Sequence, residues 1–271
     1  FAGLSTILGA PIIFILLLST QQYIEQYWSS QDQLKQIASE IKKAFETENE
    51  SITKAISTFD FETYQNQWKS KNRDGVFFEA ESKDTKGFDT TNLSYFKYVS
   101  QIESNGKVSY HINFIAPPPE GKAPKNLKDR IYLSDLRNHR NVWKVGFQSA
   151  DTLSYVMRPV VSIEKNSEEA VYAKWLTKND KSAMAIFSTQ LKSLHFTKLP
   201  IGFQFAIVDQ EGEVWFHSQA GKSTLENLFG LSQDDEALEA AIKGRVKAQG
   251  KFVYHGDDQL YARQPIKATN L

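Results

Sequence analysis

The stretch that decides the fold is residues 34–59, LKQIASEIKKAFETENESITKAISTF. Its apolar side chains recur at alternating intervals of four and three residues, which is the spacing of one face of an α-helix. The positions of this seam are Leu34, Ala38, Ile41, Phe45, Glu48, Ile52, Ala55 and Phe59. The pattern predicts one long helix from about Gln21 to Phe59, within a stalk that we place at residues 21–68.

An apolar seam can pack along its own domain, or it can pair with the same seam of a second copy. We expect both: the lower part, from Leu34 to Phe45, pairs with a second chain, and the upper part docks on the globular body. Glu48, the polar residue on the seam, marks the change of partner. The sequence therefore predicts a homodimer through the stalk.

Upstream of the stalk lies a strongly apolar segment, Leu4 to Leu18 (LSTILGAPIIFILLL). A helix needs about 20 mostly apolar residues to cross a bilayer, so we expect residues 1–20 to be part of a transmembrane helix in which the chain begins. The alternative is the apolar segment of a signal peptide. The lack of an A-x-A-like cleavage site and the continuation into the stalk favour an anchor.

The flank of this segment carries little positive charge. The first charged residue is Glu25 and the first basic one is Lys35. Cytoplasmic flanks are usually rich in Lys and Arg. We therefore expect a protein of the inner or plasma membrane, with the residues after about 20 outside the cytoplasm, in the periplasm.

Beyond Trp68 the pattern changes from helical spacing toward alternation, which is typical of strands. The strands that we expect in a first unit, at residues 69–198, are Val76–Ala80, Tyr95–Ile102, Val108–Ile115, Val142–Phe147, Val156–Glu164, Ala170–Leu176 and Ser182–Ile186. Asn105-Gly106 between two of these is a strong hairpin signal. A short helix is expected at Thr189–Phe196. The fold class is α+β.

A second unit is expected at residues 199–271. It has a hairpin around Asp209-Gln-Glu-Gly212, helices at Leu225–Phe229 and Asp234–Lys243, and a hairpin around His255-Gly-Asp-Asp258. The order strand, strand, helices, strand, strand predicts a small antiparallel sheet with helices on one face. The chain would thus carry two stacked sheet modules on one stalk.

Composition excludes several classes of function. Of 271 residues, 41% are apolar, and 32 basic side chains balance 32 acidic ones, so nothing suggests a nucleic-acid partner. The absence of Cys excludes disulfides, cysteine nucleophiles and iron–sulfur clusters. The Gly-x-Ser-x-Gly motif is absent, and the five His have no metal-ligand spacing. We expect no catalytic residue, metal or cofactor in this segment.

Three stretches carry a family resemblance: Tyr155-Val-Met-Arg-Pro-Val-Val-Ser162 with Glu168-Glu-Ala-Val-Tyr-Ala-Lys174, Ile207-Val-Asp-Gln-Glu-Gly-Glu-Val-Trp-Phe-His-Ser218, and His255-Gly256 with Leu260-Tyr-Ala-Arg263. Together with the stalk and the two units, they resemble the extracytoplasmic double Cache sensor region of bacterial transmembrane receptors. The resemblance covers about Gln21 to Ile266. It implies two PAS-like modules, membrane-distal and membrane-proximal, with a ligand pocket in the distal one.

One motif departs from this family. Its amino-acid-sensing members carry Arg-x-Trp-Tyr, followed later by a Tyr and an Asp. This chain has Arg140-Asn-Val-Trp143, which is one residue longer and lacks the adjoining Tyr, and no Asp follows within Val156–Trp175. Amino-acid binding by that arrangement is not expected.

A set of aromatic and basic side chains in the first unit forms the candidate ligand site. Small-ligand pockets combine apolar and aromatic walls with a few polar groups, and Arg among aromatic rings suits an anion. The alternative is that the Trp and Tyr side chains are ordinary core. The candidate residues are Tyr110, Arg140, Trp143, Tyr155, Arg158, Tyr172 and Trp175.

These patterns predict a sensor domain without catalysis of its own, in which a small, anionic ligand bound in the distal unit shifts the stalk helix across the membrane. An output domain would lie in another segment. Two alternatives remain: an anchored scaffold that binds another envelope protein, or an extracytoplasmic hydrolase that uses His217 or His255.

Overall fold

The computed structural model describes residues 4–61, 77–79, 95–113, 126–140, 142–146, 152–162, 167–176, 182–195, 197–233 and 235–266, with side chains of the first helix described from Ser29 onward. The chain divides into two compact units. Unit 1 comprises Phe1–Lys42 and Phe229–Pro265, and unit 2 comprises Lys43–Leu228 and Ile266–Leu271.

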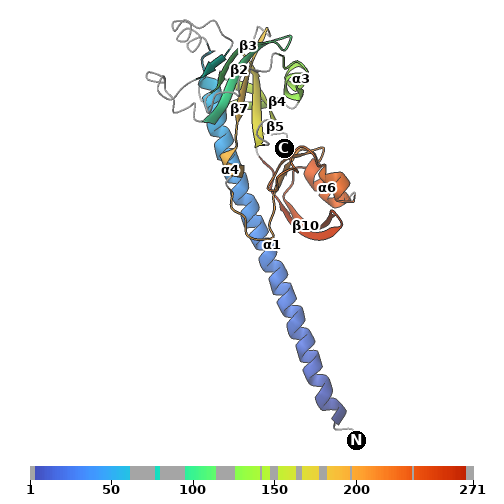
Figure 1. Cartoon of the computed structure of the whole chain (residues 1–271). Helices are drawn as coiled ribbons and strands as arrows, with labels where there is room; N and C mark the ends of the chain where they lie inside the picture. The colour runs from blue at the N-terminus through green and yellow to red at the C-terminus, as the bar shows by residue number, and fades with distance from the viewer. Residues whose placement is uncertain are drawn as a thin grey trace. The chain divides into compact units, whose positions relative to one another are not determined.

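The first element is a single long helix, α1 (Leu4–Thr58), which is blue in Figure 1. It confirms the helix predicted for Gln21–Phe59 and ends one residue earlier. The side chains of the membrane span expected at residues 1–20 lie outside the described residues. Among the residues that are described, no helix combines the length and the apolar character needed to cross a bilayer.

A seven-stranded sheet dominates unit 2, with the strand order β1-β3-β2-β7-β6-β5-β4. All neighbours are antiparallel except β1 and β3. The strands are β1 (Phe77–Glu79), β2 (Phe96–Glu103), β3 (Val108–Asn113), β4 (Val142–Gly146), β5 (Thr152–Ser162), β6 (Ser167–Trp175) and β7 (Ala183–Thr189). Each contains most of a strand predicted from alternation, and the α+β class is confirmed.

The two faces of this sheet pack against different helices. Alternate side chains point to opposite faces, so Tyr172 of β6 joins the core under α1, whereas its neighbour Val171 joins the core under α3 (Ile131–Arg137). We call these the α1 face and the α3 face (Figure 1). Ile52 of α1 is fully buried, which confirms that the upper part of the seam docks on the body. Phe45, which was expected to pair with a second chain, is also fully buried in this core, so docking begins lower on the helix than predicted.

Glu48 interrupts the apolar seam for a structural reason. Its carboxylate accepts hydrogen bonds from the backbone N–H groups of Lys192 and Ser193, at 2.8 Å each. These residues begin α4 (Lys192–His195). The helix predicted at Thr189–Phe196 is shorter than expected because Thr189 still belongs to β7, where it pairs with Phe96.

The hairpin of β8 (Ala206–Val208) and β9 (Val214–His217) also belongs to unit 2. Ile207, Trp215 and Phe216 are buried in the same core as the α1 face of the sheet. Gly212 in its turn has φ of 80°, a conformation that favours glycine. This hairpin was predicted from the sequence and is confirmed.

Unit 1 contains α6 (Glu236–Lys243) and the hairpin of β10 (Ala248–Tyr254) and β11 (Asp257–Arg263). Asp235 caps α6 by accepting from the N–H groups of Ala237 and Leu238. A two-residue turn, His255-Gly256, joins the strands, and both residues have positive φ, as a type I′ turn requires. The predicted single small sheet is not formed, because β8–β9 and β10–β11 are separate two-stranded sheets. The short α5 (Leu228–Leu231) precedes α6.

Candidate functional site

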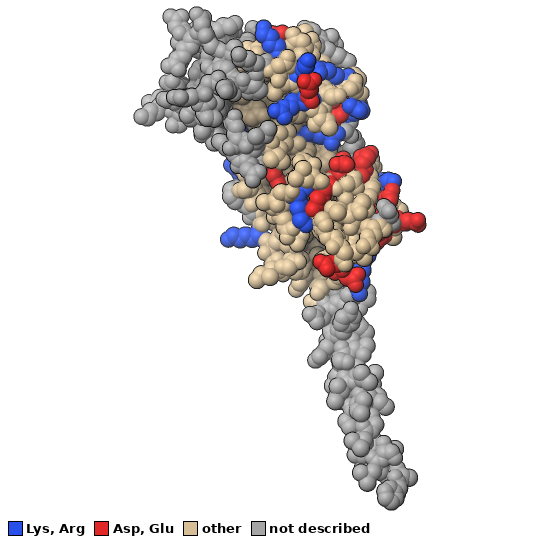
Figure 2. Space-filling model, turned by 45° about the vertical axis from the view of Figure 1, so that its right-hand side comes forward, with Lys and Arg blue, Asp and Glu red and all other residues tan. Residues whose placement is uncertain are grey.

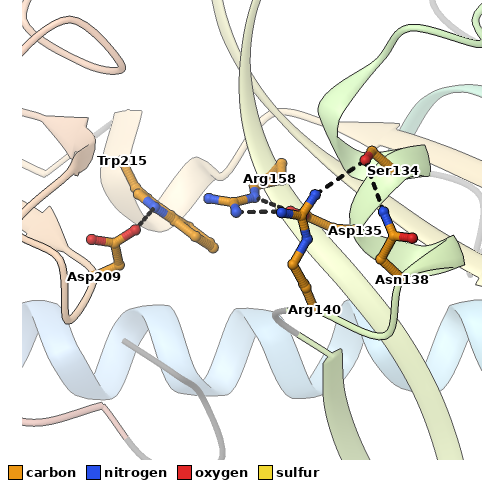
Figure 3. A network of polar contacts seen from close by, with 7 residues as sticks. All are labelled: Ser134, Asp135, Asn138, Arg140, Arg158, Asp209 and Trp215. Atoms are coloured by element: carbon orange, nitrogen blue, oxygen red, sulfur yellow. Dashed lines mark hydrogen bonds and ion pairs between the residues drawn. The ribbon is translucent and has the colours of Figure 1, made fainter.

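A carboxylate shared by two guanidinium groups lies on the α3 face, at the end of α3 (Figure 3). The side chain of Asp135 is 3% exposed and its Oδ2 lies 2.7 Å from both Nε and Nη2 of Arg158. Arg140 Nε lies 3.5 Å from Oδ1 of the same carboxylate. The Arg158 side chain is 14% exposed and that of Arg140 is 61% exposed. One carboxylate cannot neutralise two guanidinium charges, so this group carries a net positive charge.

The other side of the Arg158 guanidinium faces an aromatic ring. Its central carbon lies 4.9 Å from the centroid of Trp215 on β9, which is a cation–π contact. The indole Nε1 of Trp215 donates to Oδ2 of Asp209 at 3.0 Å. Burial raises the pKa of Asp209. The hydrogen bonds that its carboxylate accepts, including the one from Trp215, act in the opposite direction.

A second buried ion pair lies further along the α3 face. Lys97 Nζ is 2.9 Å from Oε1 of Glu169, and Ser188 Oγ donates to Oε2 at 2.5 Å. A register shift between Phe96 and Tyr98 places an extra residue in β2 at this point. Burial, followed by the charge of Glu169, raises the pKa of Tyr98 to about 12.

A buried histidine follows on β3. His111 Nδ1 lies 2.7 Å from Ser100 Oγ, and its ring lies 5.1 Å from that of Tyr98. Burial lowers the pKa of His111 to about 4, so the ring is neutral at pH 7. The α3 face thus combines an apolar core with charged and titratable groups that most cores avoid.

The α1 face holds a different kind of polar contact. Asn49 of α1 donates from Nδ2 to the Tyr155 hydroxyl at 3.3 Å and accepts at Oδ1 from the Tyr172 hydroxyl at 2.9 Å. The two tyrosine rings lie 5.6 Å apart, and Trp143 lies 5.5 Å from Tyr155. These groups are uncharged, and burial raises the pKa of both tyrosines.

The structure separates the seven predicted site residues. Trp143, Tyr155 and Tyr172 gather on the α1 face, whereas Arg140 and Arg158 meet at Asp135. Trp175 packs, partly buried, against the core under α3. Tyr110 of β3 pairs with Gln101 of β2, and the Tyr110 side chain lies outside the described residues.

Five polar residues of the α3 face were not predicted from the sequence: Asp135, Lys97, Glu169, Ser188 and His111. Two of them carried a signal. Glu169 alternates with Val171 and Ala173, which places a carboxylate on a buried strand face. Asp135 lies three residues after Tyr132, on the apolar side of a short helix. A charged residue at an apolar position indicates a buried partner.

The surface around Asp135 is basic. Lys128, Arg130, Arg140 and Lys144 are exposed, and Asp129 is the acidic residue among them. Figure 2 shows Lys and Arg side chains gathered on the part of unit 2 that carries α3. Within the described part of the chain no three His, Asp or Glu side chains converge as metal ligands do. The arrangement is suited to binding an anion by charge and hydrogen bonds.

No protein-family model matches the chain, and a search of the curated proteins finds no match. Solved structures do match. The ligand-binding domain of the Pseudomonas aeruginosa PAO1 amino acid chemoreceptor PctB, in complex with L-Arg, has a TM-score of 0.50 and 11% identity over 89% of this chain and 90% of that chain. The V. cholerae histidine kinase DctB sensor domain has a TM-score of 0.49 and 11% identity over 88% and 92% of the two chains.

A third match is the ligand-binding domain of the Campylobacter jejuni chemoreceptor Tlp3 in complex with 4-methylisoleucine, with a TM-score of 0.45, 14% identity, and coverage of 89% and 88%. The neighbours are ligand-binding sensor domains of chemoreceptors and histidine kinases, and these are double Cache domains. At this low identity the likeness to PctB establishes the fold alone. The resemblance stated from the sequence is confirmed at that level.

Proposed function

We propose that this chain is the extracytoplasmic ligand-sensing region of a membrane-bound signal-transduction receptor, and that unit 2 binds a small anionic ligand on the α3 face. The observation that carries the proposal is Asp135, one buried carboxylate that lies beside two guanidinium groups. The uncompensated positive charge attracts an anion. Arg140, whose side chain is 61% exposed, is the group that a ligand reaches first.

The ligand would have its carboxylate or phosphate at Arg140 and Arg158. Planar guanidinium groups bind such anions through two parallel hydrogen bonds. We place this site in a membrane-distal module at residues 69–198, followed by a membrane-proximal module at residues 199–271. Trp143, Tyr155 and Tyr172 would support the sheet beneath the site from its other face.

The signal would leave through α1. Phe45 and Ile52 bury this helix against the sheet, so a change in the sheet is transmitted to the helix by direct packing. We propose that the apolar residues Leu4–Leu18 anchor it in the membrane and that two stalks pair below the docked part of the helix, along Leu34–Ile41. The segment is non-enzymatic in this proposal, and an output domain would lie elsewhere in the receptor.

A ligand screen on the 271-residue chain in detergent micelles tests the proposal. A panel of carboxylates, phosphates and amino acids is added at increasing concentration, and the midpoint of thermal unfolding is recorded. A ligand at 100 times its Kd stabilises the folded state by about 2.7 kcal/mol. We expect at least one anion to raise the midpoint in a saturable way.

Two variants then locate the site. Arg140→Ala removes a charged hydrogen-bond donor to the ligand, which is worth about 1.5–3 kcal/mol and hence roughly tenfold or more in Kd. Lys54→Ala removes an exposed charge on α1, which packs on the opposite face of the sheet, and is the matched control. If no anion stabilises the chain, or if both variants bind it as well as the unchanged protein does, the proposed function is wrong. An anchored scaffold would then be favoured.

A further inference from the structure

We propose that Arg158 couples the α3-face site to the β8–β9 hairpin through the ring of Trp215. This coupling deepens the proposed function, because it names the element that responds to an occupied site. Only the existence of an anionic ligand rests on the proposed function. The coupling itself is a property of the ligand-free protein. All of its residues lie in unit 2.

The first step is the position of Arg158 between two partners. Its guanidinium forms two contacts of 2.7 Å with Asp135, and it also lies 4.9 Å from the Trp215 ring centroid. Asp135 belongs to α3, and Trp215 belongs to β9. A movement of the guanidinium toward or away from Asp135 therefore changes its contact with Trp215 (Figure 3).

The second step is the attachment of Trp215 to its own turn. Asp209, which follows β8, accepts from Trp215 Nε1 at 3.0 Å and from the backbone N–H groups of Glu211 and Glu213 at 3.1 and 2.9 Å. One carboxylate thus connects the indole to both sides of the hairpin turn. A shift of the ring is transmitted to the whole turn.

The third step is the packing of Trp215 against a second indole ring. Trp215 stacks on Trp143 of the edge strand β4, with centroids 6.3 Å apart and an angle of 12° between the rings. The buried Nε1 of Trp143 has no hydrogen-bond partner among the described residues, so packing alone sets the position of that ring. Trp215 is therefore hydrogen-bonded to the hairpin turn, whereas it contacts Trp143 through ring packing alone.

The fourth step connects the hairpin to the rest of the chain. Gly212 O accepts from the N–H of Leu228 at 2.7 Å, and Glu226 O accepts from the N–H of Val214 at 3.0 Å. Phe229, the next residue of the chain, begins the second segment of unit 1. An anion that competes with Asp135 for Arg158 would thus displace Trp215, and with it the turn that is hydrogen-bonded to the chain leading into unit 1.

The first arm of the test uses no ligand. The full chain is labelled with 5-fluorotryptophan, and the resonance of Trp215 is assigned by its loss in Trp215→Phe. Asp135→Asn removes the charge that pairs with the Arg158 guanidinium and keeps the side-chain shape. We expect it to shift the Trp215 resonance, and Arg158→Met to shift it further.

Hydrogen exchange provides the second readout of the same variants. Loss of the Asp135 charge is expected to speed amide exchange in residues 206–217 by about tenfold, since the hairpin then opens locally more often. The control is Asn138→Ala, which removes an exposed side chain that donates to Ser134 Oγ in the same polar network. It should leave both readouts unchanged.

The second arm adds inorganic phosphate as an anion probe. We expect a saturable shift of the Trp215 resonance in the unchanged protein and none in Arg158→Met. If Asp135→Asn folds, as far-ultraviolet circular dichroism reports, but leaves Trp215 and residues 206–217 unchanged, the coupling is overturned whatever phosphate does. If the first arm succeeds and no anion of the ligand panel binds, the coupling stands and the proposed anion site fails.

Discussion

The two faces of the sheet in unit 2 are built from the same strands but differ in their chemistry. The α1 face is packed with aromatic rings: Phe187 lies 5.1 Å from Phe96 and 5.4 Å from Phe59. Its polar side chains include Asn49, which bonds two tyrosines, and a cation, Lys174, which donates to the carbonyl oxygen of Ile56 in α1 and lies 5.8 Å from the Phe187 ring centroid. The α3 face buries Asp135, Glu169 and His111 beside its apolar residues.

This difference separates stability from function. Burial of apolar area stabilises a fold, whereas buried charges cost desolvation energy and seldom repay it in full. The α1 face therefore has the composition expected of a face that holds the helix to the sheet. The α3 face retains charges that its stability does not need, and this is the reason for proposing a binding site there.

The largest effect is expected on the α1 face. Phe187→Ala removes a fully buried ring from three aromatic neighbours. It should lower the free energy of unfolding by about 4 kcal/mol, because the loss of apolar burial and the new cavity add. Urea unfolding followed by circular dichroism measures this.

The exposed Ile131 is the control, and Ile131→Ala should change stability by less than about 0.5 kcal/mol. A loss below about 1 kcal/mol at Phe187 would remove the distinction between the faces.

The next effect concerns the buried ion pair of the α3 face. Lys97→Met leaves the carboxylate of Glu169, whose side chain is 8% exposed, without its cation. We expect a loss of about 3 kcal/mol, since an unpaired buried charge is costly. Adding Glu169→Gln should recover most of this loss, because the pair itself adds little net stability. A double-mutant cycle by urea unfolding measures the coupling, and additive losses would contradict this account.

The third prediction is a pH dependence from the α3 face. His111 has its pKa lowered by burial to about 4 in the folded protein, against 6.5 in the unfolded chain. Between these values the unfolded chain binds more protons, so the free energy of unfolding falls as pH drops below 6.5, and the loss caused by His111 is complete below about pH 4. From pH 7 to pH 5 the contribution is roughly 2 kcal/mol.

The variant His111→Gln isolates this contribution from other titrating groups. Its stability, measured by urea unfolding at pH 7 and pH 5, should fall by less than that of the unchanged protein. If the free energy of unfolding falls by the same amount in the two proteins, His111 is accessible to protons in the folded state.

The smallest effect concerns the polar contact of the α1 face. Tyr172→Phe removes the hydroxyl that donates to Asn49 Oδ1 at 2.9 Å and keeps the ring. A neutral buried hydrogen bond contributes about 1 kcal/mol, and thermal unfolding can measure such a change. Tyr155→Phe, which loses the longer 3.3 Å contact, should cost less. The reverse order would mean that Asn49 is placed chiefly by Tyr155.

Sequence patterns predicted the elements well where the signal is local. The seam identified the helix and, through Ile52, the face that docks, whereas Phe45 was wrongly expected to pair with a second chain. Asn105-Gly106 identified the hairpin between β2 and β3. The short α3 was not resolved within the mixed stretch at Leu127–Asn141. A seven-residue helix spans about two turns, which is too short for its periodicity to stand out.

The candidate site was predicted only in part. Arg140 and Arg158 were expected to act with the aromatic residues, but the structure places them beside Asp135. Tyr155 and Arg158 are three positions apart on one strand, so they point to opposite faces. The site residues that were not predicted have partners far away in the sequence. Arg158 and Asp135 are 23 positions apart, and Lys97 and Glu169 are 72 apart.

The amino-acid sequence by itself determined the long helix, the α+β class and the positions of the turns, because helical and strand periodicities arise between residues that are close along the chain. Only the tertiary structure decided which face each ring and each charge occupies, and which carboxylate meets which cation. Those choices depend on strand order and register. The strand order places β7 between β2 and β6, so that Lys97 and Glu169 meet across it.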